Sequence, residues 1–294
     1  MPQRWLLLAR RLFVPVALVF LALAAYGARD AFGQVLAHAR SGPLLLTVMT
    51  WSLLHLLVPV ISWIVLTGLG TGIGYRTVLR IHVSRLPARY LPGGIWQTVS
   101  RVVDLHALGV TRAQLSVLVA MENLAPLATA LVLGGIFALV AGTSPLPAPV
   151  IIGAGVLLGA ALPFAMRRFV GQAPLPLRHF LLASAVTMVF WSIAACAFAL
   201  YWSAFPSIPL GAGFAELSAS YLLAWAAGFL AVFAPQGIGV FEAVAGLLLD
   251  GALPLAGMAV MVAGFRAATL AGDGIAYLAG LMVAWATRRG DGAH

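Results

Sequence analysis

The chain has 294 residues, of which 62% are hydrophobic and only 9% are charged, and its mean hydropathy is +1.03. A soluble domain carries about a quarter charged residues, so a water-soluble fold of this composition could not cover its surface. The composition excludes a soluble globular protein and predicts an all-α, polytopic helical membrane protein whose apolar surface faces lipid.

Long apolar runs mark the predicted spans, because a helix needs roughly 20 apolar residues to cross the hydrocarbon. The runs lie at about 12–28, 44–69, 114–141, 149–166, 180–204, 215–233 and 254–287, with a short segment at about 238–250. They predict six to eight transmembrane helices in one integral membrane domain over residues 1–294. The first run could pass for a signal peptide, but a second span follows at once, and a signal-anchor explains the same residues.

Arginine supplies all 17 basic residues, and the net charge is +9. Such a balance could suggest nucleic acid binding, but the arginines sit between the apolar runs. Counted over alternate loops, fourteen arginines fall on one side, two on the other, and Arg266 within a span. By the positive-inside rule both termini are cytoplasmic, and the number of crossings is even, six or eight. We expect no nucleic acid partner.

The first interrupted segment, residues 89–96, reads Arg-Tyr-Leu-Pro-Gly-Gly-Ile-Trp. Just before it, Arg76 and Arg80 share one helical stripe. Arg85 and Arg89 fall nearly opposite, so either the chain breaks or one pair turns inward. After the glycines a short helix is predicted, with one polar and one apolar face. The polar residues are Gln97, Ser100, Arg101 and Asp104, and the apolar ones are Ile95, Val99, Val102 and Val103. This helix either lies in the interface or lines a hydrated cavity.

The second interrupted segment, residues 234–242, reads Ala-Pro-Gln-Gly-Ile-Gly-Val-Phe-Glu. Backbone broken at membrane depth is tolerated only where it is buried in protein or lines water, and such segments in corresponding halves point to a transporter's binding site. The two segments indicate a weak internal repeat, approximately 44–141 and 180–287. Helix starts and nearby arginines would attract a phosphate or carboxylate, and the glycines would let it approach the backbone. Simple turns between helices are the alternative.

Ionisable residues also fall within or beside the apolar runs: Glu122, Glu242, Asp250, Arg266 and Asp273. A charge in a lipid-facing central position costs at least about 2.5–3.5 kcal/mol, so each should face the interior and have a partner. Arg266 would pair with Asp273 or Glu242, or these residues would line a polar cavity. Asp250 is interpreted as a solvated charge at a span end, and His55 as a hydrogen-bonded core histidine. The histidines form no metal-spaced set with carboxylates, and we expect no cofactor and no catalysis.

The motifs follow a recognisable order. Leu-Pro-Gly-Gly after Arg89 is followed by Arg101, by Gly-Val at 109–110 and by Glu122 in the next span. Pro-x-Gly-x-Gly-x-x-Glu at 235–242 is followed by Arg266 in the last long span. In these paired motifs, and over nearly its whole length, the chain resembles the flippase-like membrane domain family of lysylphosphatidylglycerol synthase. It is most similar to stand-alone relatives that lack the soluble synthase domain. Gln236 departs from the glycine often found there, which bears on how a head group would fit.

The resemblance implies a protein of the bacterial plasma (inner) membrane that binds and translocates an anionic lipid. The lipid would be a phospholipid, an aminoacyl-phospholipid or a polyprenyl-phosphate-linked sugar. The predicted substrate-binding residues are Arg89, Pro92, Gly93, Gly94, Trp96, Gln97, Arg101, Glu122, Asn123, Pro235, Gly237, Gly239, Glu242 and Arg266. The arginines and backbone N–H groups would meet phosphate, and the glutamates would hold the arginines or contact sugar or amine groups.

Two other classes of protein fit the same residues. One is an integral-membrane transferase of lipid or glycan biosynthesis, with Glu122 or Glu242 as its base. The other is a non-transporting accessory subunit of a cell-envelope biosynthetic enzyme, and that enzyme or a second copy of the chain would then be a partner.

Overall fold

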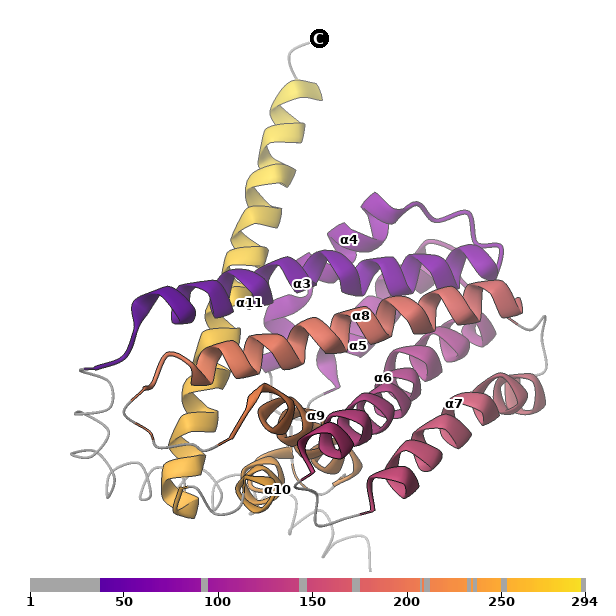
Figure 1. Ribbon diagram of the computed structural model, residues 1–294. Coiled ribbons are helices and arrows are strands. Elements are labelled where there is room, and N and C mark those ends of the chain that lie inside the picture. The colour runs from indigo at the N-terminus through magenta and orange to yellow at the C-terminus, as the bar shows by residue number, and fades with distance from the viewer. Residues whose placement is uncertain are drawn as a thin grey trace, which may run out of the picture. The chain divides into compact units, whose positions relative to one another are not determined.

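The computed structural model describes residues 38–90, 95–142, 147–170, 175–206, 208, 212–231, 234, 237–249 and 253–291, and these residues form helices and turns without a strand (Figure 1). The α-helices are α3 (Ser41–Gly68), α4 (Tyr75–Ser84), α5 (Trp96–Ala107), α6 (Arg112–Ala141), α7 (Ala148–Val170), α8 (Leu177–Trp202), α9 (Phe214–Leu230), α10 (Val240–Leu248) and α11 (Leu255–Asp291). A 3₁₀ helix, η1 (Leu86–Tyr90), lies between α4 and α5. The prediction of an all-helical chain is confirmed.

Five helices are long and apolar enough to cross a membrane, namely α3, α6, α7, α8 and α11. Each matches a predicted span, which confirms a multi-pass, membrane-like chain. Large apolar side chains stand exposed along them, with Leu157 and Phe164 of α7 each 71% exposed. Apolar surface of this extent is typical of a protein that faces lipid. The predicted span at 12–28 and Asp250 lie outside the described residues.

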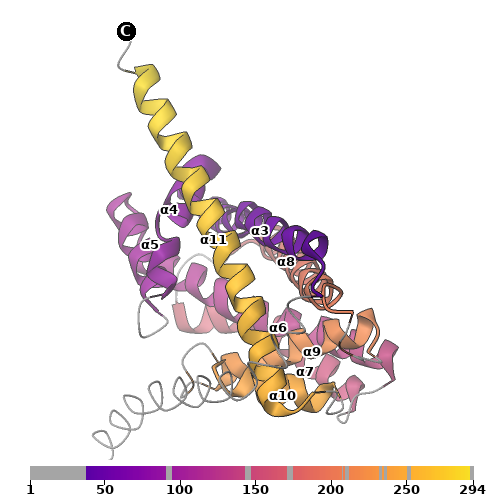
Figure 2. The same cartoon turned by 90° about the vertical axis from the view of Figure 1, so that its left-hand side faces the viewer.

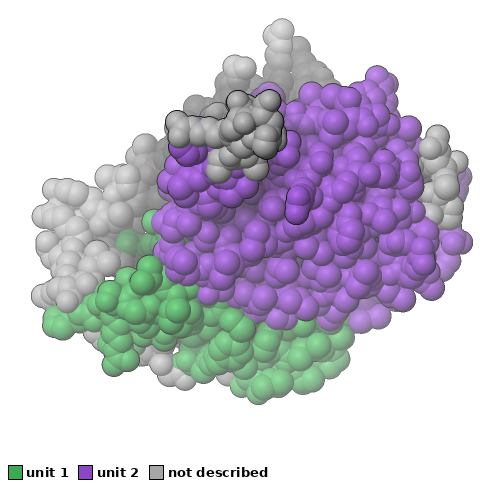
Figure 3. All heavy atoms as spheres, turned by 90° about the horizontal axis from the view of Figure 1, so that it is seen from above, with its two compact units in different colours: residues 1–47, 130–155, 195–268 green, residues 48–129, 156–194, 269–294 purple. Residues whose placement is uncertain are grey.

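The described helices divide into two compact units, which are coloured separately in Figure 3. Unit 1 takes the described residues of 1–47, 130–155 and 195–268. Unit 2 takes those of 48–129, 156–194 and 269–294.

Unit 1 contains a helical hairpin in which α9 packs against α10 (Figure 1). These two helices occupy the predicted runs at 215–233 and 238–250. Gly237 has a φ of +68°, and a Cβ there would lie 2.7 Å from the Cα of Gly228 on α9. The return turn therefore reaches α9 only because both positions are glycine. Nine residues make α10 about 14 Å long, which is less than the roughly 30 Å of hydrocarbon, so α10 cannot cross a bilayer alone.

Unit 2 holds the first interrupted segment. Here α4, η1 and α5 pack together (Figure 2). The chain changes direction at Arg85, so Arg76 and Arg80 stay exposed on α4 while Arg85 reaches Asp104 at 2.7 Å. The break therefore resolves the conflict between the two arginine pairs.

The short helix α5 confirms the predicted division into two faces, and its polar face is turned toward the protein. Arg101 is only 7% exposed, whereas Val103 on the other face is 60% exposed. A helix in water would show the reverse pattern. The exposed valines of α5 thus add to the apolar surface of unit 2.

Candidate functional site

The polar interior of unit 2 begins with Arg101 of α5 and Glu122 of α6. Arg101 Nη2 donates to Glu122 Oε1 at 2.7 Å, and Nη1 donates to Oε2 at 3.1 Å. Ser62 of α3 joins them: its hydroxyl accepts from Arg101 Nη2 at 2.9 Å and donates to Glu122 Oε1 at 2.5 Å. Two-point pairing of this kind is among the strongest arrangements that a guanidinium makes with a carboxylate.

The Arg101 guanidinium has a further N–H donor, at Nε. Arg101 Nε is buried and has no hydrogen-bond partner among the described residues. A buried donor without a partner costs about 1–3 kcal/mol, because water is lost and nothing replaces it. The buried Arg101 cation therefore has one N–H donor, at Nε, that no described residue satisfies.

A second pair lies in unit 1, between Glu242 of α10 and Arg266 of α11. Arg266 Nη2 is 3.3 Å from Glu242 Oε1, and the Arg266 guanidinium also lies over the ring of Phe241, 5.9 Å from its centroid. Glu242 Oε2 accepts the backbone N–H of Gly239 at 2.6 Å, at the start of α10. The predicted Arg266–Glu242 alternative is thus the one observed, and Glu242 also satisfies a free N–H at the helix start.

A third cluster, the Asp273 cluster, gathers around Asp273 of α11, which is 2% exposed. Oδ1 accepts from Trp51 Nε1 at 2.9 Å and from His55 Nε2 at 2.7 Å. Oδ2 accepts from the Tyr90 hydroxyl at 2.7 Å and from Arg89 Nη1 at 3.3 Å. Burial and the bond to Asp273 raise the pKa of Tyr90, so its hydroxyl stays protonated and donates. Four donors thus compensate one buried carboxylate.

The Asp273 cluster continues into a pair of histidines. His55 Nδ1 lies 3.1 Å from His82 Nε2 of α4. A carboxylate only accepts, so His55 Nε2 carries a hydrogen toward Asp273. Burial, then Arg101, His55 and Arg89, hold the pKa of His82 well below its usual value. His82 is therefore neutral, and its buried Nδ1 has no partner within the described part of the chain.

The structure places the predicted substrate-binding residues in different settings. Arg101 meets Glu122, Glu242 meets Arg266, and Arg89 meets Asp273. The Asn123 amide donates to the carbonyl of Val119 in its own helix at 2.7 Å.

The other predicted residues lie at the two interruptions. Trp96 is half exposed at the start of α5, with Gln97 next to it, and Gly237 and Gly239 lie in the turn before α10. Pro92, Gly93, Gly94 and Pro235 lie outside the described residues.

Several members of this interior were not predicted from the sequence, namely Trp51, Ser62, His82 and Tyr90. One signal was present, because His55 and Ser62 are seven residues apart on α3 and share a helical face. The prediction that His55 is a hydrogen-bonded core residue is confirmed. Across the described residues, no group of three or more His, Cys, Asp or Glu side chains is placed to hold a metal ion.

No protein-family model matches the chain, and no curated protein matches its sequence.

Proposed function

We propose that this protein is a flippase-like permease that binds an anionic lipid and translocates it across the bacterial inner membrane. The observation that carries the proposal is the buried Arg101 guanidinium, whose Nε has no partner among the described residues and which follows the Leu-Pro-Gly-Gly segment in the sequence. The lipid is a phospholipid, an aminoacyl-phospholipid or a polyprenyl-phosphate-linked sugar.

The chemistry of the pair supports exchange of one anion for another. A guanidinium binds carboxylate and phosphate with the same planar fork, so a phosphate can replace Glu122 on Arg101 without leaving the cation unpaired. A phosphate oxygen would also satisfy Nε, which Glu122 does not reach. Ser62 Oγ, at 2.5 Å, would remain a donor to the displaced carboxylate.

The proposed arrangement in the membrane extends the five candidate spans to six or eight crossings, with both termini in the cytoplasm. Support comes from the arginine distribution and from α10, which is too short to cross. In this arrangement the α9–α10 hairpin of unit 1 and the η1–α5 segment of unit 2 are each a re-entrant element, as in transporters built from broken helices.

Translocation is tested in proteoliposomes with fluorescent phosphatidylglycerol or polyprenyl phosphate, by dithionite quenching of the outer leaflet. Fluorescent phosphatidylcholine is the zwitterionic comparison. We expect the protein to accelerate exchange of at least one anionic lipid over protein-free vesicles, and phosphatidylcholine much less. Equal rates with and without protein for both anionic lipids would contradict the proposal.

The matched variants remove one ion pair each. Arg101→Gln/Glu122→Gln keeps the buried site neutral and able to hydrogen-bond, and we expect it to reduce exchange to the protein-free rate. Arg85→Gln/Asp104→Asn removes the more exposed pair of the same unit, where Nε–Oδ2 is 2.7 Å, and should leave exchange unchanged.

A specific observation favours a second candidate, the non-transporting accessory subunit. Each of the three arginines predicted to meet phosphate contacts a carboxylate of the protein. If these pairs have only a structural role, an Arg101→Gln/Glu122→Gln variant with the thermal stability of the native chain will keep the protein's cellular function. The integral-membrane transferase has no comparable observation in its favour.

A further inference from the structure

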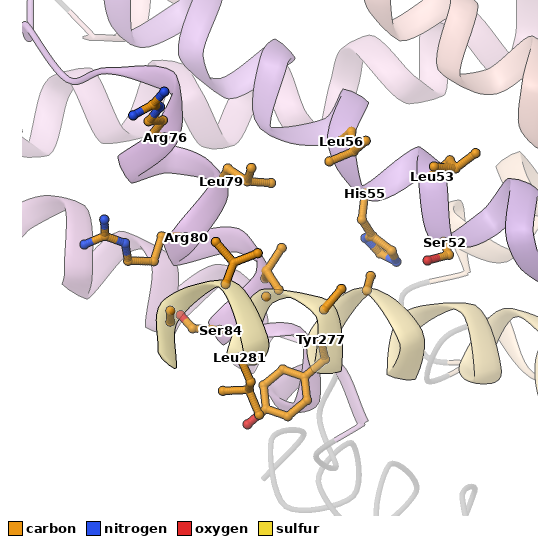
Figure 4. A pocket seen from close by; sticks show the side chains of 16 residues that line it. Ser52, Leu53, His55, Leu56, Arg76, Leu79, Arg80, Ser84, Tyr277 and Leu281 are labelled. Carbon is orange, nitrogen blue, oxygen red and sulfur yellow. The ribbon is translucent and has the colours of Figure 1, made fainter. Parts of the chain in front are cut away.

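Unit 2 contains a cavity of about 690 Å³ that shares only His55 with the clusters described above (Figure 4). Its walls come from α3, α4 and α11, and none of the predicted substrate-binding residues lines it. The volume falls within the roughly 300–1,000 Å³ typical of ligand pockets.

The walls of this cavity are mostly apolar. They include Leu53 and Leu56 of α3, Leu79 and Val83 of α4, and Leu281 and Val283 of α11. Two of the three helices, α3 and α11, are candidate membrane spans, so a ligand that enters between them comes from the bilayer. A long hydrocarbon chain is the ligand group that such walls favour, because burial of apolar surface is the main favourable term there.

Two cations stand at one end of the cavity. Arg76 and Arg80 lie toward that end, and His55 and Ser52 toward the other (Figure 4). Both arginines are exposed, and neither has a hydrogen bond or ion pair within the described ranges. They are four residues apart on α4, so their like charges repel unless an anion lies between them.

The start of α4 adds to this positive end. Its first turn contains Arg76 and no acidic residue, and Gly74 provides no side-chain cap. The free N–H groups of a helix start favour an anion in the same place. Arginines on the predicted cytoplasmic side are also where anionic head groups are found.

We propose that this cavity holds an anionic lipid, with its phosphate at Arg76 and Arg80 and an acyl or prenyl chain along the walls of α3, α4 and α11. The inference rests on the proposed function in taking a lipid as the ligand, and it names a holding site separate from Arg101. The site adjoins the Asp273 cluster, because His55 lines the cavity and also contacts Asp273 at 2.7 Å.

The test uses the full chain in nanodiscs with phosphatidylglycerol that carries a diazirine in its acyl chain. After illumination, labelled peptides are mapped by mass spectrometry. We expect labels on the stretches 52–56 and 279–284, and weaker labelling by phosphatidylcholine with the same acyl chain. Arg76→Gln/Arg80→Gln should reduce labelling about thirtyfold, since each arginine near an anionic head group contributes on the order of 1 kcal/mol.

Two further variants make the result specific. Arg112→Gln/Arg167→Gln removes two other exposed arginines of unit 2 that do not line the cavity, and should leave labelling unchanged. Ala279→Trp fills the cavity from an exposed position in its wall and should prevent labelling.

The proposal is overturned if both lipids label the cavity equally and Arg76→Gln/Arg80→Gln has no effect, because the cavity then holds bulk lipid only. The exchange assay on the same protein separates this failure from failure of the proposed function. Specific labelling without exchange would leave the cavity site standing and reject translocation. Exchange with unspecific labelling would support translocation and reject the cavity site.

Discussion

Arg101 of α5 and Glu122 of α6 form a buried two-point ion pair, 2.7 Å from Nη2 to Oε1 and 3.1 Å from Nη1 to Oε2. In the other unit, Glu242 of the short helix α10 pairs with Arg266 of the following long helix α11. Each interrupted segment is thus followed by a short helix that pairs with the next long one, with the two charges exchanged. This correspondence agrees with the predicted internal repeat, which stays a prediction.

The energetics of the Arg101–Glu122 pair can be separated from its function by a double-mutant cycle. Arg101→Met alone leaves a buried carboxylate without its cation, and we expect a loss of about 3–5 kcal/mol of stability. Arg101→Met/Glu122→Met should recover most of it. Unfolding in mixed detergent micelles measures both. Additive losses for the two single variants would show that the residues do not interact.

Asp273 should be far more important for stability than Asp104. Asp273→Asn removes the charge that four donors share and places an NH₂ against one pair of them, which we expect to cost about 2–4 kcal/mol. Asp104→Asn removes a partly exposed pair with Arg85, where a change within about 1 kcal/mol is expected. Thermal unfolding followed by tryptophan fluorescence compares the two variants, and Trp51 of the Asp273 cluster is one of the eight tryptophans that contribute to the signal. Equal losses of stability in the two variants would contradict the prediction that Asp273 stabilises the fold more than Asp104 does.

The close approach of Gly237 to Gly228 predicts a local intolerance of side chains. Gly237→Ala combines a positive φ of +68° with a Cβ 2.7 Å from the Gly228 Cα. Gly70→Ala meets the same backbone penalty, with a φ of +73°, in open space. We expect the second variant to lose about 1–2 kcal/mol and the first clearly more, because α9 and the turn must separate. Similar melting temperatures for both variants would show that the close packing of Gly237 on Gly228 does not contribute to stability.

Acidification should destabilise the protein through His82. Its pKa is held well below the usual value by burial, then by Arg101, His55 and Arg89. Below about pH 6.5 the unfolded chain binds a proton that the folded chain excludes, so this stability is complete above that pH and is lost as the pH falls. The slope from one group is at most about 1.4 kcal/mol per pH unit.

The variant His82→Gln retains a donor toward His55 but cannot titrate. Melting temperatures between pH 5.0 and 8.0 should therefore depend less on pH in His82→Gln than in the native chain. Parallel curves would show that other groups account for the acid sensitivity.

The orientation in the membrane can be tested by labelling introduced cysteines, because Cys196 is the single cysteine of the chain and is easily replaced. In a Cys196→Ser background, Ser144→Cys should react with an impermeant maleimide in intact cells. Arg112→Cys, at the start of α6 on the arginine-rich side, should react only after permeabilisation. The opposite pattern would invert the predicted topology.

The sequence alone determined the long helices, the two interruptions and the polar face of α5. Hydropathy and helical periodicity are local properties, and in lipid they leave the backbone little choice other than a helix. The rule that an intramembrane charge needs a partner also predicted that Glu122, Glu242, Arg266 and Asp273 face the interior and have partners.

Only the tertiary structure decided which partner each charge has. The sequence allowed Arg266 to pair with Asp273 or Glu242, and the fold selects Glu242, whereas Asp273 meets His55, Trp51 and Tyr90. Those contacts join residues up to 222 positions apart, and their geometry depends on how helices pack rather than on any local pattern. The cavity between α3, α4 and α11 arises in the same way, because its two arginines come from α4 while its apolar walls are shared by all three helices.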